Sequence, residues 1–174
     1  MKYYAGIGSR KTPIKIQEKM TEYAYELEKL GYILRSGGAE GADLAFEIGV
    51  QKDDMKEIYL PWKDFNNNKS KYYNITKKAF ELGKEYHKGW SYLKPGAKKL
   101  MARNGYQVLG YDLKTPSNFI LCWTDDGCES SEKRTQKTGG TGQAIDIAYK
   151  NDIKVYNLKN SKSIKEFEKE ILKL

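Results

Sequence analysis

Short apolar runs alternate along this chain with longer stretches in which apolar residues recur every three or four positions. The apolar runs predict five β-strands, over residues 3–7, 32–34, 57–60, 118–123 and 153–156. The periodic stretches predict six helices, over residues 14–30, 41–50, 69–84, 95–109, 141–150 and 163–172. Strands that alternate with helices are typical of parallel βαβ units with right-handed crossovers. We therefore predict an α/β fold: a Rossmann-like open parallel sheet with helices on both faces.

Residues that start or stop regular structure mark the ends of several predicted elements. Pro13 and Pro95 lie where helices are expected to begin, because proline is tolerated in the first helical turn. Gly31 closes the first helix, and Pro61 ends the third strand. Ser163 is predicted to cap the last helix.

Length and composition indicate one folded domain over residues 1–174. The chain is 39% hydrophobic and 31% charged, which is typical of a soluble protein. No apolar run approaches the roughly 20 residues of a membrane span, so we expect no membrane partner. The placement of the two cysteines does not suggest a disulfide framework, and with one histidine no zinc site can be assembled from soft ligands alone. The start of the chain lacks the apolar stretch of a signal peptide, so a cytoplasmic location is expected. The one long irregular segment, residues 124–138, is typical of a functional or mobile loop.

The chain carries an excess of positive charge. Its 31 lysines and arginines outnumber 23 acidic residues and give a net charge of +8. A basic protein attracts nucleic acids and phosphorylated small molecules. Many lysines, however, lie at helical spacing in residues 69–84 and 159–173, and we interpret those two stretches as solvated helix faces.

Three glycine-rich loops follow predicted strands, and each opens a helix. Glycine allows close approach to the backbone, and the unpaired N–H groups and dipole of a helix start favour a phosphate. In an open α/β sheet such loops gather at one edge. The predicted ligand-binding residues are Gly8, Ser9 and Arg10 in the first glycine loop, Ser36, Gly37, Gly38, Gly41 and Asp43 in the second, and Gly139, Gly140, Thr141, Gly142 and Gln143 in the third.

None of these loops has a standard nucleotide-binding signature. No loop contains the Gly-Lys-Ser/Thr of the phosphate loop, which disfavours ordinary ATPase or GTPase chemistry. The first glycine loop lacks the full Gly-x-Gly-x-x-Gly pattern, because Lys11 occupies the last glycine position. A standard dinucleotide dehydrogenase is therefore disfavoured as well.

Four segments nevertheless carry a resemblance to known families. Residues 8–13 and 36–43, then Arg103-Asn104, resemble in order the signatures of the DNA-processing protein A family. Residues 139–142, followed by Asp146, are similar to the Gly-Gly-x-Gly-Thr-x-x-Glu signature of the Lonely Guy phosphoribohydrolases. Both families belong to the SLOG superfamily of Rossmann-like nucleotide-binding domains, and the resemblance covers about residues 3–158. Small stand-alone members of this type also occur in phages, where binding of nucleotide signals is expected.

The departures from these signatures bear on function. Lonely Guy enzymes hydrolyse the N-glycosidic bond of a nucleoside monophosphate, using a Glu in the signature and a nearby Arg. Here Asp146 stands at the Glu position, Gly142-Gln143 replaces the Gly-Thr step, and Thr138 replaces the usual proline. Arg103 can serve as the arginine, but its surroundings are more similar to the DNA-processing family, which binds single-stranded DNA and usually carries extra domains.

Each of several residues in these segments has two interpretations. Arg10 is predicted to clamp a phosphate, rather than to be a surface arginine at a turn. Asp43 either accepts from a ribose hydroxyl or only complements a helix dipole. Glu40 is either a general acid or base, or a solvated loop residue. Arg103-Asn104 either contact the ligand or mark a helix end before a break at Gly105. Asp125-Asp126-Gly127 is predicted to be a turn, rather than a Mg²⁺ or sugar site.

Residues outside these segments give weaker indications. His87 is predicted to be an exposed helix-end residue. Tyr72, Tyr73, Trp62 and Trp90 form a cluster in the sequence that either stacks on a base or packs a lid or partner surface.

Three functions follow as hypotheses. The leading one is binding of a nucleotide or nucleotide-derived signal, as a sensor or a sponge. The second is an N-glycosidase acting on nucleoside 5′-monophosphates, with Asp146 or Glu40 as the catalytic carboxylate. The third is a single-stranded DNA binder, indicated by the net charge and by Arg103-Asn104. No separate cofactor and no metal are predicted, and a homo-oligomer is expected.

Overall fold

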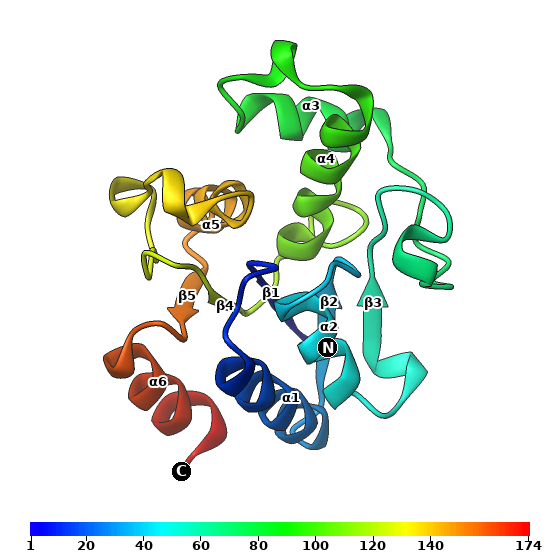
Figure 1. Cartoon of the computed structure of the whole chain (residues 1–174). Helices are drawn as coiled ribbons and strands as arrows, with labels where there is room; N and C mark the ends of the chain where they lie inside the picture. Colours follow the sequence, from blue (N-terminus) through cyan, green and yellow to red (C-terminus); the bar gives the residue numbers. More distant parts are fainter.

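The five strands form a single parallel sheet in the computed structural model, which describes residues 1–174 (Figure 1). The order across the sheet is β3-β2-β1-β4-β5. The strands are β1 (Lys2–Gly8), β2 (Tyr32–Ser36), β3 (Lys56–Ile58), β4 (Phe119–Trp123) and β5 (Lys154–Asn157). The chain runs outward from β1 to β3 and then returns to β4 on the other side of β1. In open α/β sheets, ligands bind at the carboxyl edge beside such a reversal.

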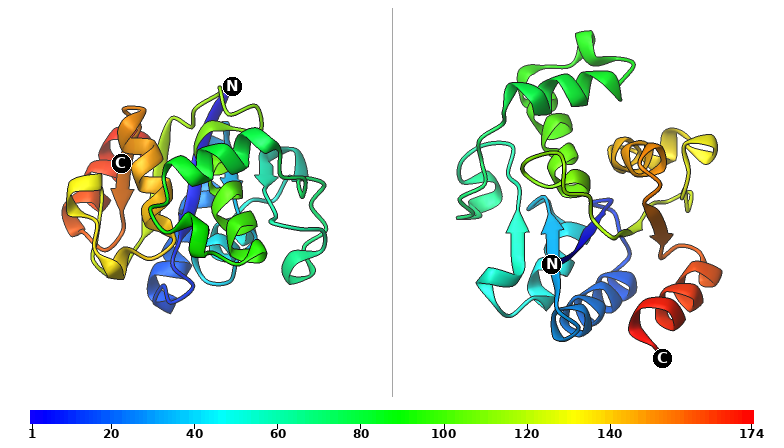
Figure 2. Two further views of the ribbon diagram at one scale, coloured as in Figure 1. Left: turned by 90° about the horizontal axis from the view of Figure 1, so that it is seen from above. Right: turned by 180° about the vertical axis from the view of Figure 1, so that it is seen from behind.

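Helices cover both faces of this sheet (Figure 2). One face packs against α1 (Ile14–Lys29), α2 (Ala42–Gly49) and α6 (Ser161–Phe167). The other packs against α4 (Pro95–Leu109) and α5 (Thr141–Lys150), while α3 (Lys77–Glu85) packs on the outer side of α4. None of these helices combines the length and the apolar character that a membrane crossing requires. The predicted α/β fold is confirmed.

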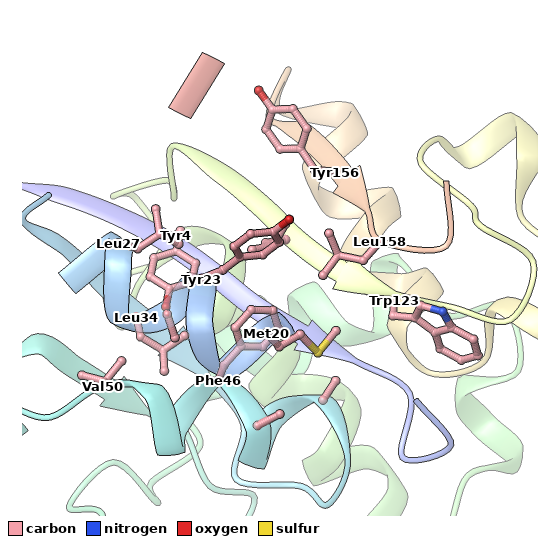
Figure 3. Close-up of a cluster of buried hydrophobic side chains, with 14 of the residues drawn as sticks. Tyr4, Met20, Tyr23, Leu27, Leu34, Phe46, Val50, Trp123, Tyr156 and Leu158 are labelled. Atoms are coloured by element: carbon pink, nitrogen blue, oxygen red, sulfur yellow. The ribbon is translucent and has the colours of Figure 1, made fainter. Parts of the chain in front are cut away.

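The alternation of side chains along β1 and β4 divides the core into two layers. Tyr4 and Phe119 point toward α1, α2 and α6 and join a large cluster of buried side chains, part of which Figure 3 shows. Phe119 is central there, because its ring lies within 6 Å of the rings of Tyr4, Tyr156 and Phe167. Ala5 and Ile120, one position further along each strand, face α4 and α5. The sheet is therefore buried on both faces, as a parallel sheet requires.

The helix predicted over residues 69–84 was wrong in its first half. Helix α3 begins only at Lys77, where the Thr76 hydroxyl caps it by accepting from Ala79 N at 3.2 Å. The preceding segment instead lies along the outer edge of the sheet. Leu60 N donates to the Tyr72 carbonyl at 2.7 Å there. The prediction failed because the backbone of this segment hydrogen-bonds to the chain that follows β3. Local periodicity cannot predict such a tertiary contact.

The end of the chain also differs from its prediction. Helix α6 begins at Ser161, and its cap residue, Asn160, makes no side-chain capping bond. Ser163, the predicted cap, lies inside the helix, where its hydroxyl donates to Glu129 instead. The final turn, over Glu168–Leu172, widens into a π-helix.

Close packing of α1 against α2 depends on Gly49. A Cβ atom at this position would overlap the Thr21 carbonyl oxygen. We expect Gly49→Ala to lower the free energy of unfolding by about 1–3 kcal/mol, the usual cost of overpacking a core. The matched control is Gly96→Ala in α4, where the nearest atom would be a Trp62 ring carbon at 3.7 Å. This control should be neutral or stabilising, by up to about 1 kcal/mol. Urea denaturation measures both, and equal midpoints for the two variants would contradict the prediction.

Candidate ligand-binding site

The first and second glycine loops touch directly at the carboxyl edge of the sheet. Ser9 N donates to the Trp123 carbonyl of β4 at 3.1 Å, and Ala42 N donates to the Ser9 carbonyl at 3.3 Å. Gly41 lies so close to the first glycine loop that a Cβ atom would approach Arg10 Cα to 2.7 Å. The two loops therefore form one surface, and glycine at position 41 allows the contact.

The serines of these loops hold the loops in place. The buried Ser36 hydroxyl donates to the Gly6 carbonyl at 2.6 Å and thereby ties β2 to β1. The Ser9 hydroxyl accepts from Lys11 N at 3.0 Å, within its own turn. Arg10, in contrast, is exposed, and its guanidinium makes no hydrogen bond or ion pair with the protein. Of these three residues, Arg10 has the side chain that is free to meet a ligand.

A buried ion pair lies beneath the second glycine loop. Arg103 Nη1 and Asp43 Oδ2 are 3.6 Å apart, and only 8% and 5% of the two side chains are exposed. Asp43 also accepts from Ala39 N at 3.3 Å. Arg103 Nε has no hydrogen-bond partner. Gly37 makes room for this arrangement, since a Cβ atom there would overlap the guanidinium of Arg103.

Burial shifts the pKa values of both charged groups. It raises the pKa of Asp43 to about 6, although Arg103 and the backbone amides of the loop oppose the shift. It lowers the pKa of Arg103, and Asp43 opposes that shift. The charge of Arg10 lowers the pKa of Arg103 further. The exposed guanidinium of Arg10 and the buried guanidinium of Arg103 are therefore close enough to repel each other, and Asp43 is the counter-charge of Arg103.

Polar side chains continue from Arg103 along α4. The Gln107 amide, oriented so that its atoms meet complementary partners, accepts from Arg103 Nη1 at 2.9 Å and from Gly37 N at 3.0 Å. It also donates to Asn104 Oδ1 at 3.3 Å. All three side chains of α4 are buried. The second glycine loop is therefore held by hydrogen bonds to α4.

The same row of side chains reaches the third glycine loop. Asn104 Nδ2 donates to Gln143 Oε1 at 3.0 Å, and Gly140 O lies at the hydrogen-bond limit of 3.5 Å. Gln143 Nε2 donates to the Gly83 carbonyl of α3 at 3.0 Å. The members of this row are Asp43, Arg103, Gln107, Asn104 and Gln143. It joins the second and third glycine loops through the interior of the protein.

Arg103 and Asn104 were predicted either to contact the ligand or to mark a helix end before Gly105. The structure contradicts the helix end, because α4 continues through Gly105 to Leu109. Glycine at this position serves close packing, since a Cβ atom would come within 2.8 Å of the Leu82 side chain of α3.

The third glycine loop leaves its backbone open. Nothing lies within 4 Å of the position that a Gly139 Cβ would occupy, and at Gly140 only the flexible end of Met101 is near, at 3.4 Å. Thr141 follows as the first residue of α5. Unpaired N–H groups at this helix start, beside two exposed glycines, leave space for an anion.

The two candidate catalytic carboxylates lie in different settings. Asp146 forms an ion pair with Arg134 of the loop of residues 124–138. The Arg134 side chain lies against Gly142 at the start of α5. Glu40 is exposed and has no hydrogen bond or ion pair within the protein.

Asp126 organises the loop of residues 124–138. Its carboxylate accepts from Thr124, Thr135 and Thr138, and from Cys128 N. Partial burial would raise its pKa, but these hydrogen bonds outweigh it and lower the pKa to about 2. Asp125-Asp126-Gly127 thus forms a turn, as predicted, with Gly127 N bonded to the Thr124 carbonyl at 3.2 Å.

The aromatic residues of the middle segment do not form one stacking surface. Tyr72 packs against Tyr59 and Tyr111, at ring distances of 5.3 and 6.0 Å. Trp90 instead packs edge-on against Phe80, and Trp62 packs against Phe65. His87 follows the end of α3 and is half-buried rather than exposed. These residues serve local packing.

Gln107 and Arg134 belong to the site but were not predicted from sequence. Gln107 follows Arg103 and Asn104 at four- and three-residue spacings, so the three share one face of α4. This spacing could have identified Gln107, because a polar side chain on a buried helix face needs a hydrogen-bond partner there. Arg134 gave no signal, because it lies in an irregular loop.

No family model, curated protein or solved structure matches this chain. The resemblance to the SLOG superfamily therefore stays a prediction, and the geometry described above is the basis for the functional proposals.

Asp43 should make stability depend on pH in a predictable direction. Its folded-state pKa, about 6, lies above the roughly 3.9 of an unfolded chain. The folded state therefore holds the proton more tightly, and stability is lost as pH rises from about 4 to 6. Relative to the isosteric Asp43→Asn variant, wild-type stability should fall across this window and level off above it. Chemical denaturation at a series of pH values measures this, and parallel curves for the two proteins would contradict it.

Proposed function

We propose that this protein binds a nucleotide or a nucleotide-derived phosphate compound at the glycine loops on the carboxyl edge of the sheet. The observation that carries the proposal is the pair of guanidiniums at the second glycine loop. Arg10 has no protein partner. The buried Arg103 has an ion pair with Asp43 at 3.6 Å and a hydrogen bond to Gln107, and its Nε has no partner. A buried positive charge that is incompletely paired is costly, and a nearby anion offsets that cost.

Backbone geometry supports the same ligand chemistry. The third glycine loop leads into α5, whose first N–H groups and helix dipole favour negative charge. The exposed backbone at Gly139 and Gly140 allows a phosphate to approach closely. A nucleotide combines a phosphate with a base and a sugar, and fits the edge of an open α/β sheet. The resemblance to SLOG domains agrees with this proposal.

Binding is a better proposal than glycosidic hydrolysis. A glycosidase needs a carboxylate at the anomeric carbon, free to stabilise developing positive charge. Asp146 is instead held in an ion pair with Arg134. Glu40 is exposed on a loop and has no hydrogen bond or ion pair that would position it. We therefore propose a sensor or a sponge for the nucleotide, rather than an enzyme.

Replacement of Arg10 tests the proposal. Arg10→Ala should weaken binding of a nucleoside 5′-monophosphate by about 1.5–3 kcal/mol, the value of a hydrogen bond to a charged group. Lys11→Ala is the matched control, because Lys11 is also an exposed cation in the first glycine loop. It should change the affinity by less than about 0.5 kcal/mol, the usual range for a surface substitution. Isothermal titration calorimetry measures both variants.

Equal effects of the two substitutions would show that the loop attracts anions only by its general charge, and would contradict a specific site. Chromatography of the nucleotide recovered after the titration separates binding from hydrolysis, since the proposal predicts that the nucleotide is intact.

A further inference from the structure

The Arg134 side chain lies against the third glycine loop, in a space that a glycine leaves for it. A Cβ atom at position 142 would overlap Arg134 Nε and lie 3.0 Å from its Cζ. Gly142 is in the first turn of α5, and its backbone is not in the left-handed region that requires glycine. Glycine also weakens a helix relative to alanine. The guanidinium that packs on Gly142 therefore accounts for the glycine.

This guanidinium keeps unused hydrogen-bonding capacity. A guanidinium carries five N–H donors. The partner of Arg134 in the protein is the Asp146 carboxylate, to which Nη1 donates, and 32% of the Arg134 side chain is exposed. Gly139 and Gly140, whose backbone is open, precede Gly142 by three and two residues. A ligand on this open backbone is therefore within reach of the guanidinium.

The ion pair with Arg134 is not needed to hold its loop in place. The Thr135 hydroxyl donates to Asp126 at 2.7 Å, and the Tyr149 hydroxyl of α5 donates to Glu132 at 3.1 Å. These contacts lie on both sides of Arg134 in the chain, so they hold the backbone there independently of the ion pair. The side chain can therefore change its partner without a movement of the loop.

We propose that Arg134 is a phosphate-binding residue of the third glycine loop, and that Asp146 is the partner it leaves when the phosphate binds. This inference rests on the proposed function, because it concerns the same ligand. Arginine suits the exchange, since its planar guanidinium pairs with carboxylate and with phosphate oxygens in the same bidentate geometry. Asp146 is then an internal anion that competes with the ligand for Arg134.

Competition gives the effect of Asp146 on affinity a definite sign. An apparent affinity is reduced by the fraction of molecules in which the binding group is available. Partly exposed ion pairs are weak, so release of Arg134 from Asp146 should improve the affinity by about threefold. A carboxylate that itself holds the ligand would give the opposite sign.

Calorimetric titration of four variants with GMP tests the inference. Arg134→Ala should weaken GMP binding by about tenfold or more, because a charge-assisted hydrogen bond is lost. Lys133→Ala, which removes the neighbouring exposed cation, is the matched control and should change the affinity by less than about threefold. Asp146→Asn should strengthen binding by about threefold. The double variant, Arg134→Ala with Asp146→Asn, should bind about tenfold or more weakly than Asp146→Asn alone, because the contact of Arg134 with the phosphate does not require Asp146.

The sign of the Asp146→Asn effect keeps the test decisive, since a damaged fold does not raise an affinity. If Asp146→Asn weakens binding or leaves it unchanged, Asp146 does not compete with the ligand and the exchange is overturned. If the double variant binds as tightly as Asp146→Asn alone, Arg134 only neutralises Asp146 and does not contact the phosphate.

Failure of this inference is distinguishable from failure of the proposed function. If Arg10→Ala weakens GMP binding while all four variants bind like the wild type, the proposed function stands and the role of Arg134 is overturned. Should the wild type not bind GMP, the proposed function fails, and this inference fails with it.

Discussion

The positive charge of Arg103 is buried beneath a backbone loop, and the carboxyl edge of the sheet is arranged around it. Moving a guanidinium out of water is expensive unless hydrogen bonds and a counter-charge replace the solvent. Here the replacements are the Asp43 carboxylate at 3.6 Å and the Gln107 amide at 2.9 Å. Because Nε has no partner, this compensation is incomplete. The residual positive charge lies under the loop that a phosphate would contact.

Several features of the sequence follow from this one buried group. Gly37 leaves the space that the guanidinium occupies, and Asp43 lies in the first turn of α2, where its carboxylate reaches both Arg103 and the loop amides. Gln107 and Asn104 extend the contacts to Gln143 and the third glycine loop. Loops that are far apart in the sequence are thus held in fixed relation by side chains of α4. Such support is what a preformed anion site requires, since it leaves little to be ordered when the ligand arrives.

The sequence was sufficient for the fold and for the glycine loops, and insufficient for the contacts between them. Five apolar runs predicted the five strands to within about two residues, because both faces of a parallel sheet are buried. The helix at 69–76 was wrong, since lysines at helical spacing also occur in an extended edge segment that Tyr72 fastens to Leu60. Gln107 and Arg134 were missed because their roles depend on which elements the fold brings together. Asp146 was proposed as a catalytic carboxylate, but its ion pair with Arg134 joins residues of different elements, and no local pattern predicts that pairing.

The central claim is that three loops, joined through α4, form one anion-binding site. The most direct measurement is a titration with GMP, followed by the backbone amide signals in two-dimensional NMR spectra. The account predicts that amides in residues 8–12, 37–41 and 139–142 shift together and fit one dissociation constant. Shifts confined to one loop, or different constants for different loops, would contradict a single site.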